Sequence, residues 1–297
     1  MGSTLYRKKE PLIAFLLPAF LFLLLFLYYP FVQNILNSFS DITGLGAPAQ
    51  GLNDPWYVNY ATLLTDPKLR TALGNTVLLT VCTVAFQVGI ALVLALLVDS
   101  IRVGAQLFRT LYFFPIVISA TALGLMFNLI FLYNGGMLNQ LLVNLGIAAE
   151  NIDWKDADHF LLTMFSPVMW QYVGFYFVIL VTGLNNISQD LYEAAALDGC
   201  TGLKRVRFVT LPLLRNVLCT CLVLAITGAL KVFDLPWVMF GAGMPQDQGW
   251  LTGTYMYDQT FNRGNVDYGS AIAVLIVVLG VLFSNVANRV FKPRSDL

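Results

Sequence analysis

The sequence predicts an all-α, polytopic membrane protein with six transmembrane helices. Its 297 residues are 58% hydrophobic and only 11% charged, whereas soluble domains carry about 25% charged residues. Several apolar runs reach the roughly 20 residues that a helix needs to cross a bilayer. The runs that meet this requirement lie at residues 12–32, 73–98, 110–132, 161–184, 213–240 and 270–291.

The first apolar run is expected to remain in the protein as a membrane anchor. It follows the basic residues Arg7, Lys8 and Lys9 and could be read as the core of a cleaved signal peptide. However, it is longer than the 7–15 apolar residues of a signal core, and no small-residue cleavage site follows it.

The positions of the positive charges predict the orientation of the helices. With the N-terminus in the cytoplasm, 12 of the 17 Lys and Arg residues fall on the cytoplasmic side and four fall outside. This asymmetry follows the positive-inside rule and places both termini in the cytoplasm. The cytoplasmic set is Arg7, Lys8, Lys9, Arg102, Arg109, Lys204, Arg205, Arg207, Arg215, Arg289, Lys292 and Arg294, and the outside set is Lys68, Arg70, Lys155 and Arg263.

Composition also excludes several other classes of protein. Lys plus Arg and Asp plus Glu number 17 each, so there is no basic surplus that would favour nucleic-acid binding. One His and four Cys argue against a His-rich metal site and against a disulfide-stabilised secreted module. No Lys stands in a Gly-x-x-x-x-Gly-Lys-Ser/Thr motif, so the sequence lacks a P-loop for ATP. Without a P-loop or a catalytic constellation, we expect neither enzymatic activity nor a cofactor bound by this chain.

One cytoplasmic loop, residues 188–212, carries more local structure than an ordinary connection. Acidic residues including Glu193 stand in the first turn of a predicted helix, where they suit the helix dipole. Three alanines follow with high helix propensity, and Gly199 supplies a residue suited to ending the helix. Thr201 is expected to cap a second short helix over residues 202–210. A well-capped connector between two spans would show the same features, so these residues alone do not assign a function.

The sequence of this loop resembles a known motif. Glu-Ala-Ala at residues 193–195, Asp-Gly at 198–199 and Leu-Pro at 211–212 look like the EAA loop of binding-protein-dependent ABC importer permeases, in both anchors and spacing. Two positions depart from the family pattern: Cys200 stands where Ala is usual, and Val206 stands where Phe is common.

The resemblance covers nearly the whole chain and is closest to the carbohydrate branch of that family, which includes the maltose permease. It implies a type I ABC importer permease fold in the inner membrane of a bacterial-type cell. Further segments that resemble this branch are Tyr29-Pro30, Asn59-Tyr60, Asn75-Thr76, residues 109–115, residues 136–139 and residues 231–234. The family division corresponds to residues 1–72 for a cytoplasmic segment, the first helix and an external loop, 73–291 for the five-helix core, and 292–297 for a cytoplasmic tail.

The resemblance also implies partners and a mechanism. Such permeases pair with a second permease subunit as a heterodimer, contact membrane lipid, bind two ATPase subunits that carry ATP and Mg, and receive sugar from an extracytoplasmic sugar-binding protein. They form half of the translocation path and work by alternating access. The EAA loop is their coupling helix, seated on an ATPase. The coupling residues implied here are Glu193 as a polar anchor, Ala194 and Ala195 for close approach, Asp198, and Gly199 for the turn.

A candidate substrate path lies in the fourth and fifth spans. Gln171, Tyr172 and Phe175 lie within a turn of one another on one side of a helix, and aromatic faces with amide groups suit the C–H and hydroxyl surfaces of sugars. By resemblance, spans four and five line the sugar site, and Gly228 would leave room there. Aromatic residues in spans also serve packing and interface belts, so packing alone is the alternative. Gln87 and Asn128 are weaker candidates of the same kind.

Two opposite charges, Lys231 and Asp234, lie within the fifth predicted span. Charges at the centre of a span cost roughly 2.5–3.5 kcal/mol, so each needs a reason. At about 1.5 Å per residue, Lys231 lies some 27 Å along the span, near the outer interface. Residues three apart are neighbours on one helix face, so we expect an ion pair. The alternative is an external gate or a contact to the binding protein.

Other functions remain possible at this point. An ion-coupled secondary transporter commonly carries inverted repeats and acids near the middle of the membrane; no internal repeat is seen, and the spans other than the fifth hold no Asp or Glu beyond their edges. A membrane scaffold or channel subunit would not need the coupling loop. Within the ABC family, glycerol-phosphate or polyol substrates stay open alternatives to a sugar or oligosaccharide.

Overall fold

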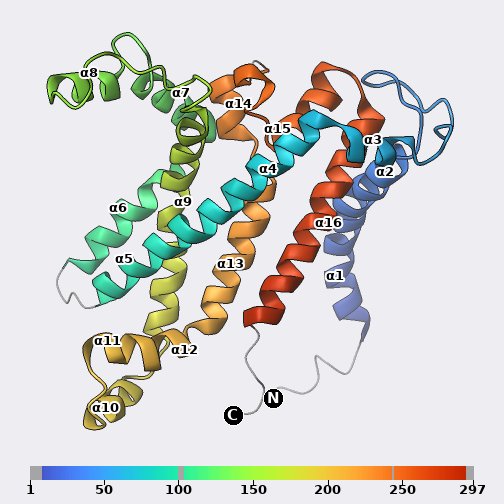
Figure 1. Cartoon of the computed structure of the whole chain (residues 1–297). Coiled ribbons are helices and arrows are strands. Elements are labelled where there is room, and N and C mark those ends of the chain that lie inside the picture. Colours follow the sequence, from blue (N-terminus) through green and yellow to red (C-terminus); the bar gives the residue numbers. More distant parts are fainter. Residues whose placement is uncertain (1–8, 100–103, 243, 292–297) are drawn as a thin grey trace. The chain divides into compact units, whose positions relative to one another are not determined.

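The computed structural model describes residues 9–99, 104–242 and 244–291, and is built from helices (Figure 1). Within these residues there is no β-strand, only the isolated bridges Ser40–Leu52 and Thr43–Asn265. The chain forms two compact units. The first comprises Met1–Asp66 and Met256–Leu275, and the second comprises Pro67–Tyr255 and Ile276–Leu297.

Residues 256–275 join the first unit rather than the second, although they lie far from residues 1–66 in the sequence. The division expected from the sequence, 1–72, 73–291 and 292–297, stays a prediction. A polar network explains why residues 256–275 join the first unit. The amide Nδ2 of Asn59 donates to Ser38 O at 3.1 Å and to a carboxylate oxygen of Asp267 at 2.9 Å, and the hydroxyl of Tyr268 donates to Asp66 at 2.7 Å. Predicted cytoplasmic residues Arg7, Lys8, Arg102, Lys292 and Arg294, and the tail 292–297, lie outside the described residues.

The first unit contains the first span and a short helix beyond it. The span runs without a break through α1 (Lys9–Leu23), a π-helical turn η1 (Leu24–Tyr28) and α2 (Tyr29–Asn37). Its apolar stretch Leu12–Asn37 is long enough to cross a bilayer, and none of it is buried against the rest of the chain. The loop beyond it leads to α3 (Val58–Thr65).

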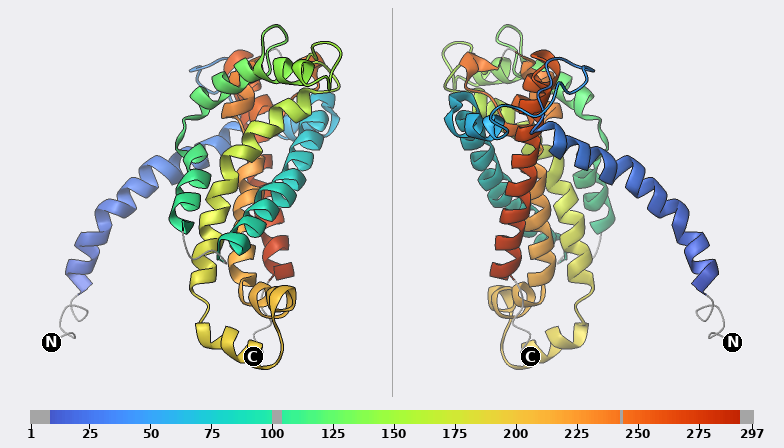
Figure 2. Two further views of the ribbon diagram at one scale, coloured as in Figure 1. Left: turned by 90° about the vertical axis from the view of Figure 1, so that its left-hand side faces the viewer. Right: turned by 90° about the vertical axis from the view of Figure 1, so that its right-hand side faces the viewer.

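Long helices form the second unit. The second span comprises α4 (Pro67–Cys82), the π-helical turn η2 (Thr83–Val88) and α5 (Gly89–Asp99), the fourth is α9 (Phe160–Asn185), and α13 (Arg215–Leu230) begins the fifth. The sixth span is the long helix α16 (Val266–Phe291), of which residues 266–275 belong to the first unit. Helices α5, α9 and α13 lie side by side (Figures 1 and 2). Their shared core contains the small residues Ala91, Ala95, Cys221 and Ala225, which allow close approach of membrane helices. The larger residues Phe177, Leu180 and Leu184 fill the same core.

The third span is not the single helix that the sequence predicts at residues 110–132. It consists of α6 (Ala105–Val117) and α7 (Ala120–Ile130), which are bent by 94° relative to each other. Ile118 is extended between them, and the hydroxyl of Ser119 accepts a hydrogen bond from Ala122 N, which caps α7. The break within this span was not predicted, because a count of apolar residues does not detect a new helix start inside the run.

The fifth span is also interrupted. Helix α13 ends at Leu230, residues 231–233 are irregular, and α14 covers Asp234–Phe240, although the whole stretch Arg215–Phe240 is long and apolar enough to cross a membrane. The next helix, α15 (Thr252–Tyr257), supports the interruption. The hydroxyl of Thr252 donates to Leu230 O at 3.1 Å, and a Cβ on Gly253 would lie 2.6 Å from Val232 O. The interruption is thus stabilised by α15: Leu230 O accepts a hydrogen bond from it, and Val232 O is closely covered by Gly253.

The two ends of the second unit carry different structures. Helices α7, α8 (Met137–Asn144) and α14 lie at one end, and α10 (Gln189–Leu197) with α11 (Gly202–Arg205) lies at the other, beyond the ends of α9 and α13 (Figures 1 and 2). A π-helical turn η3 (Val206–Thr210) and α12 (Leu211–Leu213) connect α11 to α13, while the 3-10 turn η4 (Pro245–Asp247) and the π-helical turn η5 (Asp258–Asn262) flank α15.

Substituting Gly174 by Ala is expected to destabilise the second unit. Gly174 on α9 is buried, and a Cβ there would overlap the backbone carbonyl of Tyr112 on α6, so the helices must separate. Overpacking of this kind costs about 3 kcal/mol, seen as a lower melting temperature of the detergent-solubilised protein. Gly74→Ala is the matched control, because a Cβ there meets nothing within 4 Å. Equal melting temperatures for the two variants would contradict the close α6–α9 contact.

Candidate functional site

The second unit contains a cavity of ≈ 340 Å³. Its walls come from η2, α9 and α13, together with the first residues of α7 and α14. The lining residues are Thr83, Gln87, Ala120, Val168, Gln171, Tyr172, Phe175, Tyr176, Leu224, Ala225, Thr227, Gly228, Ala229, Lys231, Val232, Phe233, Asp234 and Leu235. A volume near 300–1,000 Å³ is typical of small-molecule sites.

All four residues predicted for a substrate path line this cavity: Gln171, Tyr172, Phe175 and Gly228. A Cβ on Gly228 would meet no atom within 4 Å, so the glycine borders open space. The structure thus brings together residues of the two spans that the sequence analysis assigned to one path. Whether they bind substrate stays a prediction.

Two glutamines place amide oxygens at the cavity. Nε2 of Gln87 donates to Val168 O at 2.8 Å, and Nε2 of Gln171 donates to Ile118 O at 3.4 Å, at the bend between α6 and α7. The residues are 2% and 5% exposed. Among the described residues neither Oε1 accepts a hydrogen bond, and neither oxygen is sequestered from solvent. Both oxygens are therefore available to a hydroxyl donor in the cavity.

The interruption of regular helix geometry positions several of these groups. Gln87 and Thr83 belong to the π-helical turn η2, and π-bulges are often found at functional sites because they redirect side chains. From α9, the aromatic rings of Tyr172, Phe175 and Tyr176 add flat apolar surfaces beside polar hydroxyls. The arrangement offers amide, hydroxyl and aromatic contacts to an uncharged polar molecule.

The expected ion pair between Lys231 and Asp234 is not formed. Helix α13 ends just before Lys231 and α14 starts at Asp234, so the two residues are not on one continuous helix face. The ion pairs among the described residues are Lys68–Asp247, His159–Asp156 and Arg263–Asp258. Both charges are exposed and line the cavity. The weaker candidate Asn128 does not line it.

The predicted coupling loop forms a compact pair of short helices. Ser188 caps α10 by accepting a hydrogen bond from Asp190 N at 3.3 Å, and Gly199 turns the chain with φ of +71°. The guanidinium of Arg205 lies over the ring of Tyr192, 5.0 Å from its centroid. The predicted second helix 202–210 is divided into α11 and η3, and Thr201 occupies the N-cap position without a side-chain hydrogen bond.

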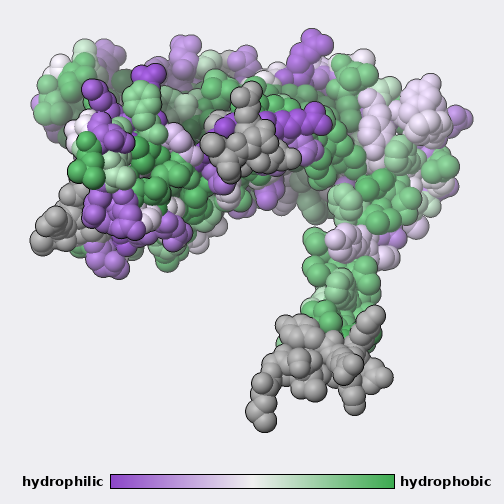
Figure 3. Space-filling view, turned by 90° about the horizontal axis from the view of Figure 1, so that it is seen from below, coloured by the Kyte–Doolittle hydropathy of each residue, from purple (hydrophilic) through white to green (hydrophobic). Residues whose placement is uncertain are grey.

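Much of this loop is open to solvent. Glu193, Ala194, Asp198 and Gly199 are exposed and Ala195 is half-buried. Figure 3 looks onto the end of the molecule that carries α10 and α11, where hydrophilic and hydrophobic residues lie side by side.

Sequence reasoning missed two apolar residues of this surface. Leu197 at the end of α10 is 91% exposed, and Leu203 on α11 is 87% exposed. They could have been noticed from the sequence, because both are large apolar residues in predicted short helices that lie outside the predicted spans. Both leucines lie on the same pair of short helices as the predicted coupling residues.

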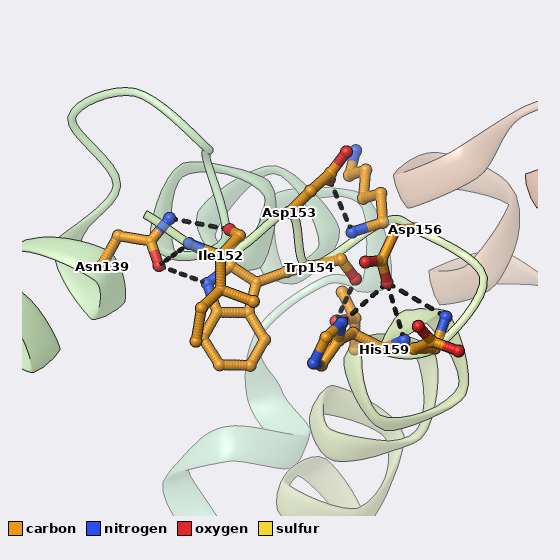
Figure 4. Close-up of polar contacts among 9 residues, drawn as sticks. Asn139, Ile152, Asp153, Trp154, Asp156 and His159 are labelled. Carbon is orange, nitrogen blue, oxygen red and sulfur yellow. Dashed lines mark hydrogen bonds and ion pairs between the residues drawn. The ribbon is translucent and has the colours of Figure 1, made fainter. Parts of the chain in front are cut away.

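A hydrogen-bonded loop lies between α8 and α9 (Figure 4). Oδ1 of the buried Asn139 accepts hydrogen bonds from Ile152 N and from Nε1 of Trp154, at 3.2 and 2.9 Å. Nδ1 of His159 lies 2.7 Å from a carboxylate oxygen of Asp156. Desolvation alone would raise the pKa of Asp156, but hydrogen bonds with His159 and with the backbone of Asp158 bring that pKa below its usual value.

Comparison with known proteins identifies related chains along nearly the full length. The probable ABC transporter permease YurN of Bacillus subtilis is 31% identical over 285 residues, which cover 95% of this chain and 96% of YurN. The arabinooligosaccharides transport system permease protein AraP of the same organism is 29% identical and covers 96% of this chain and 89% of AraP.

Solved structures share the fold. The bacterial ABC transporter involved in import of the acidic polysaccharide alginate contains a chain that superposes with a TM-score of 0.83 at 20% identity, covering 98% of both chains. A second structure shows the alginate transporter in complex with an alginate pentasaccharide-bound periplasmic protein, with a TM-score of 0.82 and 20% identity, covering 98% of this chain and 96% of the other.

The chain therefore shares the fold of an ABC importer permease over nearly its whole length. The sequence matches the model of one family over residues 11–296. This chain belongs to the family of binding-protein-dependent transport system inner membrane components, which are multi-pass membrane transport permeases.

Proposed function

We propose that this chain is the permease subunit of an ATP-driven importer for a sugar or oligosaccharide, forming half of the translocation path. The observation that carries this proposal is the cavity between η2, α9 and α13, which presents two free amide oxygens beside aromatic rings. The names of relatives support a saccharide, because AraP is a permease for arabinooligosaccharides.

The proposed partners follow from the surfaces at the two ends of the second unit. The α10–α11 pair, with Glu193, Ala194, Ala195, Asp198 and Gly199, docks on one of two separate ATPase subunits that bind ATP and Mg. A second permease subunit completes the path as a heterodimer. The opposite end receives an extracytoplasmic sugar-binding protein. This orientation places both termini in the cytoplasm and Lys231 and Asp234 near the external mouth, where they gate access.

Reconstitution tests the proposal directly. The chain is purified with its copurifying subunits in proteoliposomes, and ATP-dependent uptake is measured with maltotriose, lactose, raffinose, arabinotriose, sorbitol and glycerol 3-phosphate. Uptake of a saccharide that requires ATP supports the proposal. Preferred uptake of sorbitol or glycerol 3-phosphate would show that the substrate is a polyol or a glycerol-phosphate instead of a saccharide. Uptake driven by an ion gradient with no ATPase present would show that the protein is an ion-coupled transporter.

Loss of the cavity's polar and aromatic groups is expected to weaken uptake. In Gln171→Ala one hydrogen-bonding amide disappears, which costs about 1 kcal/mol and raises KM about fivefold. Tyr172→Ala removes a ring face and a hydroxyl, so we expect a similar or larger rise. Thr182→Ala is the control on α9, because Thr182 is exposed and lies outside the cavity lining. Unchanged KM and selectivity in both cavity variants would remove these residues from the path.

A further inference from the structure

Helices α7 and α14 pack closely against each other at the external end of the cavity. A Cβ on Gly124 of α7 would lie 2.7 Å from Val238 Cγ1, so the helices approach closely there. Nδ2 of Asn128 also donates to Val238 O at 3.4 Å. The opposite ends of the same two helices border the cavity through Ala120 of α7 and through Asp234 and Leu235 of α14. Movement of the pair therefore moves the cavity wall.

A lysine of the external loop, Lys155, bridges α7 and α14 by hydrogen bonds to both helices. Nζ of Lys155 donates to Oδ1 of Asn128 at 2.7 Å and to Met239 O at 2.9 Å, and it lies 5.4 Å from the ring centroid of Phe240. The last carbonyl groups of a helix have no partner within the helix, and a cation is favourable near that end. Lys155 and Asn128 together thus cap α14 at its C-terminal end.

Lys155 lies in a partly buried place. Desolvation lowers the pKa of Lys155 from its usual value, while the nearby carboxylate of Asp153 opposes that shift. The ammonium group is also the link between two elements that are distant in sequence, since Asn128 lies on α7 and Met239 on α14.

The loop that carries Lys155 is itself rigid. Trp154 next to it is buried, and its indole N–H donates to Asn139. The hydroxyl of Thr163, near the start of α9, donates to Trp154 O at 2.6 Å. On the other side of Lys155, Asp156 is held by His159 (Figure 4). A displacement of this loop is therefore passed to Lys155 rather than absorbed within the loop.

We propose that Lys155 is a positioning residue that couples the external loop, residues 152–159, to the α7–α14 wall of the cavity. The inference rests on the proposed function: a saccharide-loaded binding protein resting on the loop shifts the wall through Lys155 and so changes access to the cavity. The role of Lys155 is to transmit this displacement, and the residue itself does not line the cavity.

The test compares Lys155→Met with wild type in the reconstituted complex. Met keeps most of the volume of Lys155 but donates to neither Asn128 nor Met239. We expect the ATPase stimulation by the binding protein, loaded with the best saccharide of the uptake panel, to fall about five- to tenfold, with basal hydrolysis and subunit assembly retained. Lys155→Arg keeps the cation and its donors, so it should recover most of the stimulation.

Two further variants make the result specific. Asn128→Ala removes the acceptor on α7 and should reproduce the Lys155→Met loss, with no further loss in the double variant. Lys68→Met is the matched control, because Lys68 also forms an external contact, a 2.8 Å ion pair with Asp247, but does not join α7 to α14 through Asn128 and Met239. Its stimulation should match wild type.

Hydrogen exchange gives a readout that needs no ligand. Backbone amides at residues 234–240 should exchange faster in Lys155→Met than in wild type or Lys68→Met. Wild-type stimulation and exchange in Lys155→Met would overturn the inference, and so would an equal fall of basal and stimulated hydrolysis, since that result indicates a structural role only. A wild-type complex without saccharide-dependent hydrolysis would contradict the proposed function, while the exchange comparison would still test the contact itself.

Discussion

From the proposed docking of α10–α11 on an ATPase subunit, Leu197→Asp is expected to detach that subunit and to abolish ATP-driven uptake. Leu197 is 91% exposed and Leu203 is 87% exposed, although both are large apolar residues on the α10–α11 pair. Burying a leucine at an interface contributes about 1.5–3 kcal/mol, and an unpaired carboxylate in the same place adds a further penalty. A combined loss of about 3 kcal/mol or more corresponds to a fall of more than about 100-fold in affinity.

The substitution should leave the permease itself folded, because no residue of α10 is buried within this chain. Copurification of the ATPase and uptake in proteoliposomes measure the effect. Leu197→Met is the matched control, since a volume-conserving apolar exchange costs under about 1.5 kcal/mol. If Leu197→Asp kept its ATPase and transported at the wild-type rate, α10 would not be the docking helix.

Much of the helical framework is predictable because lipid imposes a simple length rule. The predicted fourth span 161–184 corresponds to α9 (Phe160–Asn185), and the second and sixth predicted spans fall within longer helical stretches. A continuous apolar run of about 20 residues has few alternatives to a helix in a bilayer. The same rule does not predict whether the helix bends or is interrupted within the apolar run. The 94° bend at Ile118 and the interruption at 231–233 leave the apolar count unchanged.

Local signals for these two breaks exist but are weak on their own. Ser119 is a residue suited to starting a helix, and it follows Pro115 within the third run. The interruption after Leu230 depends on Thr252 and Gly253, which approach from α15 more than 20 residues later. Such tertiary support cannot be read from residues 231–234 themselves, which is why a single helix and an ion pair between Lys231 and Asp234 were expected.

The candidate site was predictable to a different degree. The helical spacing of Gln171, Tyr172 and Phe175 placed them on one face, and the cavity includes that face. For Gln87 and Asn128 the sequence offered equal grounds, since each is an amide within a predicted span. The structure separates them through packing: Gln87 enters the cavity from η2, whereas Asn128 is held between Lys155 and Val238. Only the positions of neighbouring helices distinguish the two.

Gly228→Trp is expected to block the translocation path. The glycine lies on α13 at the wall of the ≈ 340 Å³ cavity. Because a Cβ there meets nothing within 4 Å, an added side chain enters open space rather than another helix. An indole would fill the region between α13 and the aromatic residues of α9, where the proposed saccharide passes. ATP-driven uptake in proteoliposomes should fall to background, while the ATPase still copurifies.

Two matched variants distinguish the effect of the size of the new side chain from the effect of its position. Gly228→Ala adds one methyl group to the same open space, so it should retain most of the uptake. Gly74→Trp introduces the same indole at an exposed glycine of α4 that also has no atom within 4 Å of a Cβ, but that lies outside the cavity lining. Uptake lost only in Gly228→Trp identifies the cavity as the path. Wild-type uptake in Gly228→Trp would mean that solute crosses elsewhere, since a cavity filled by an indole has no room for a sugar ring.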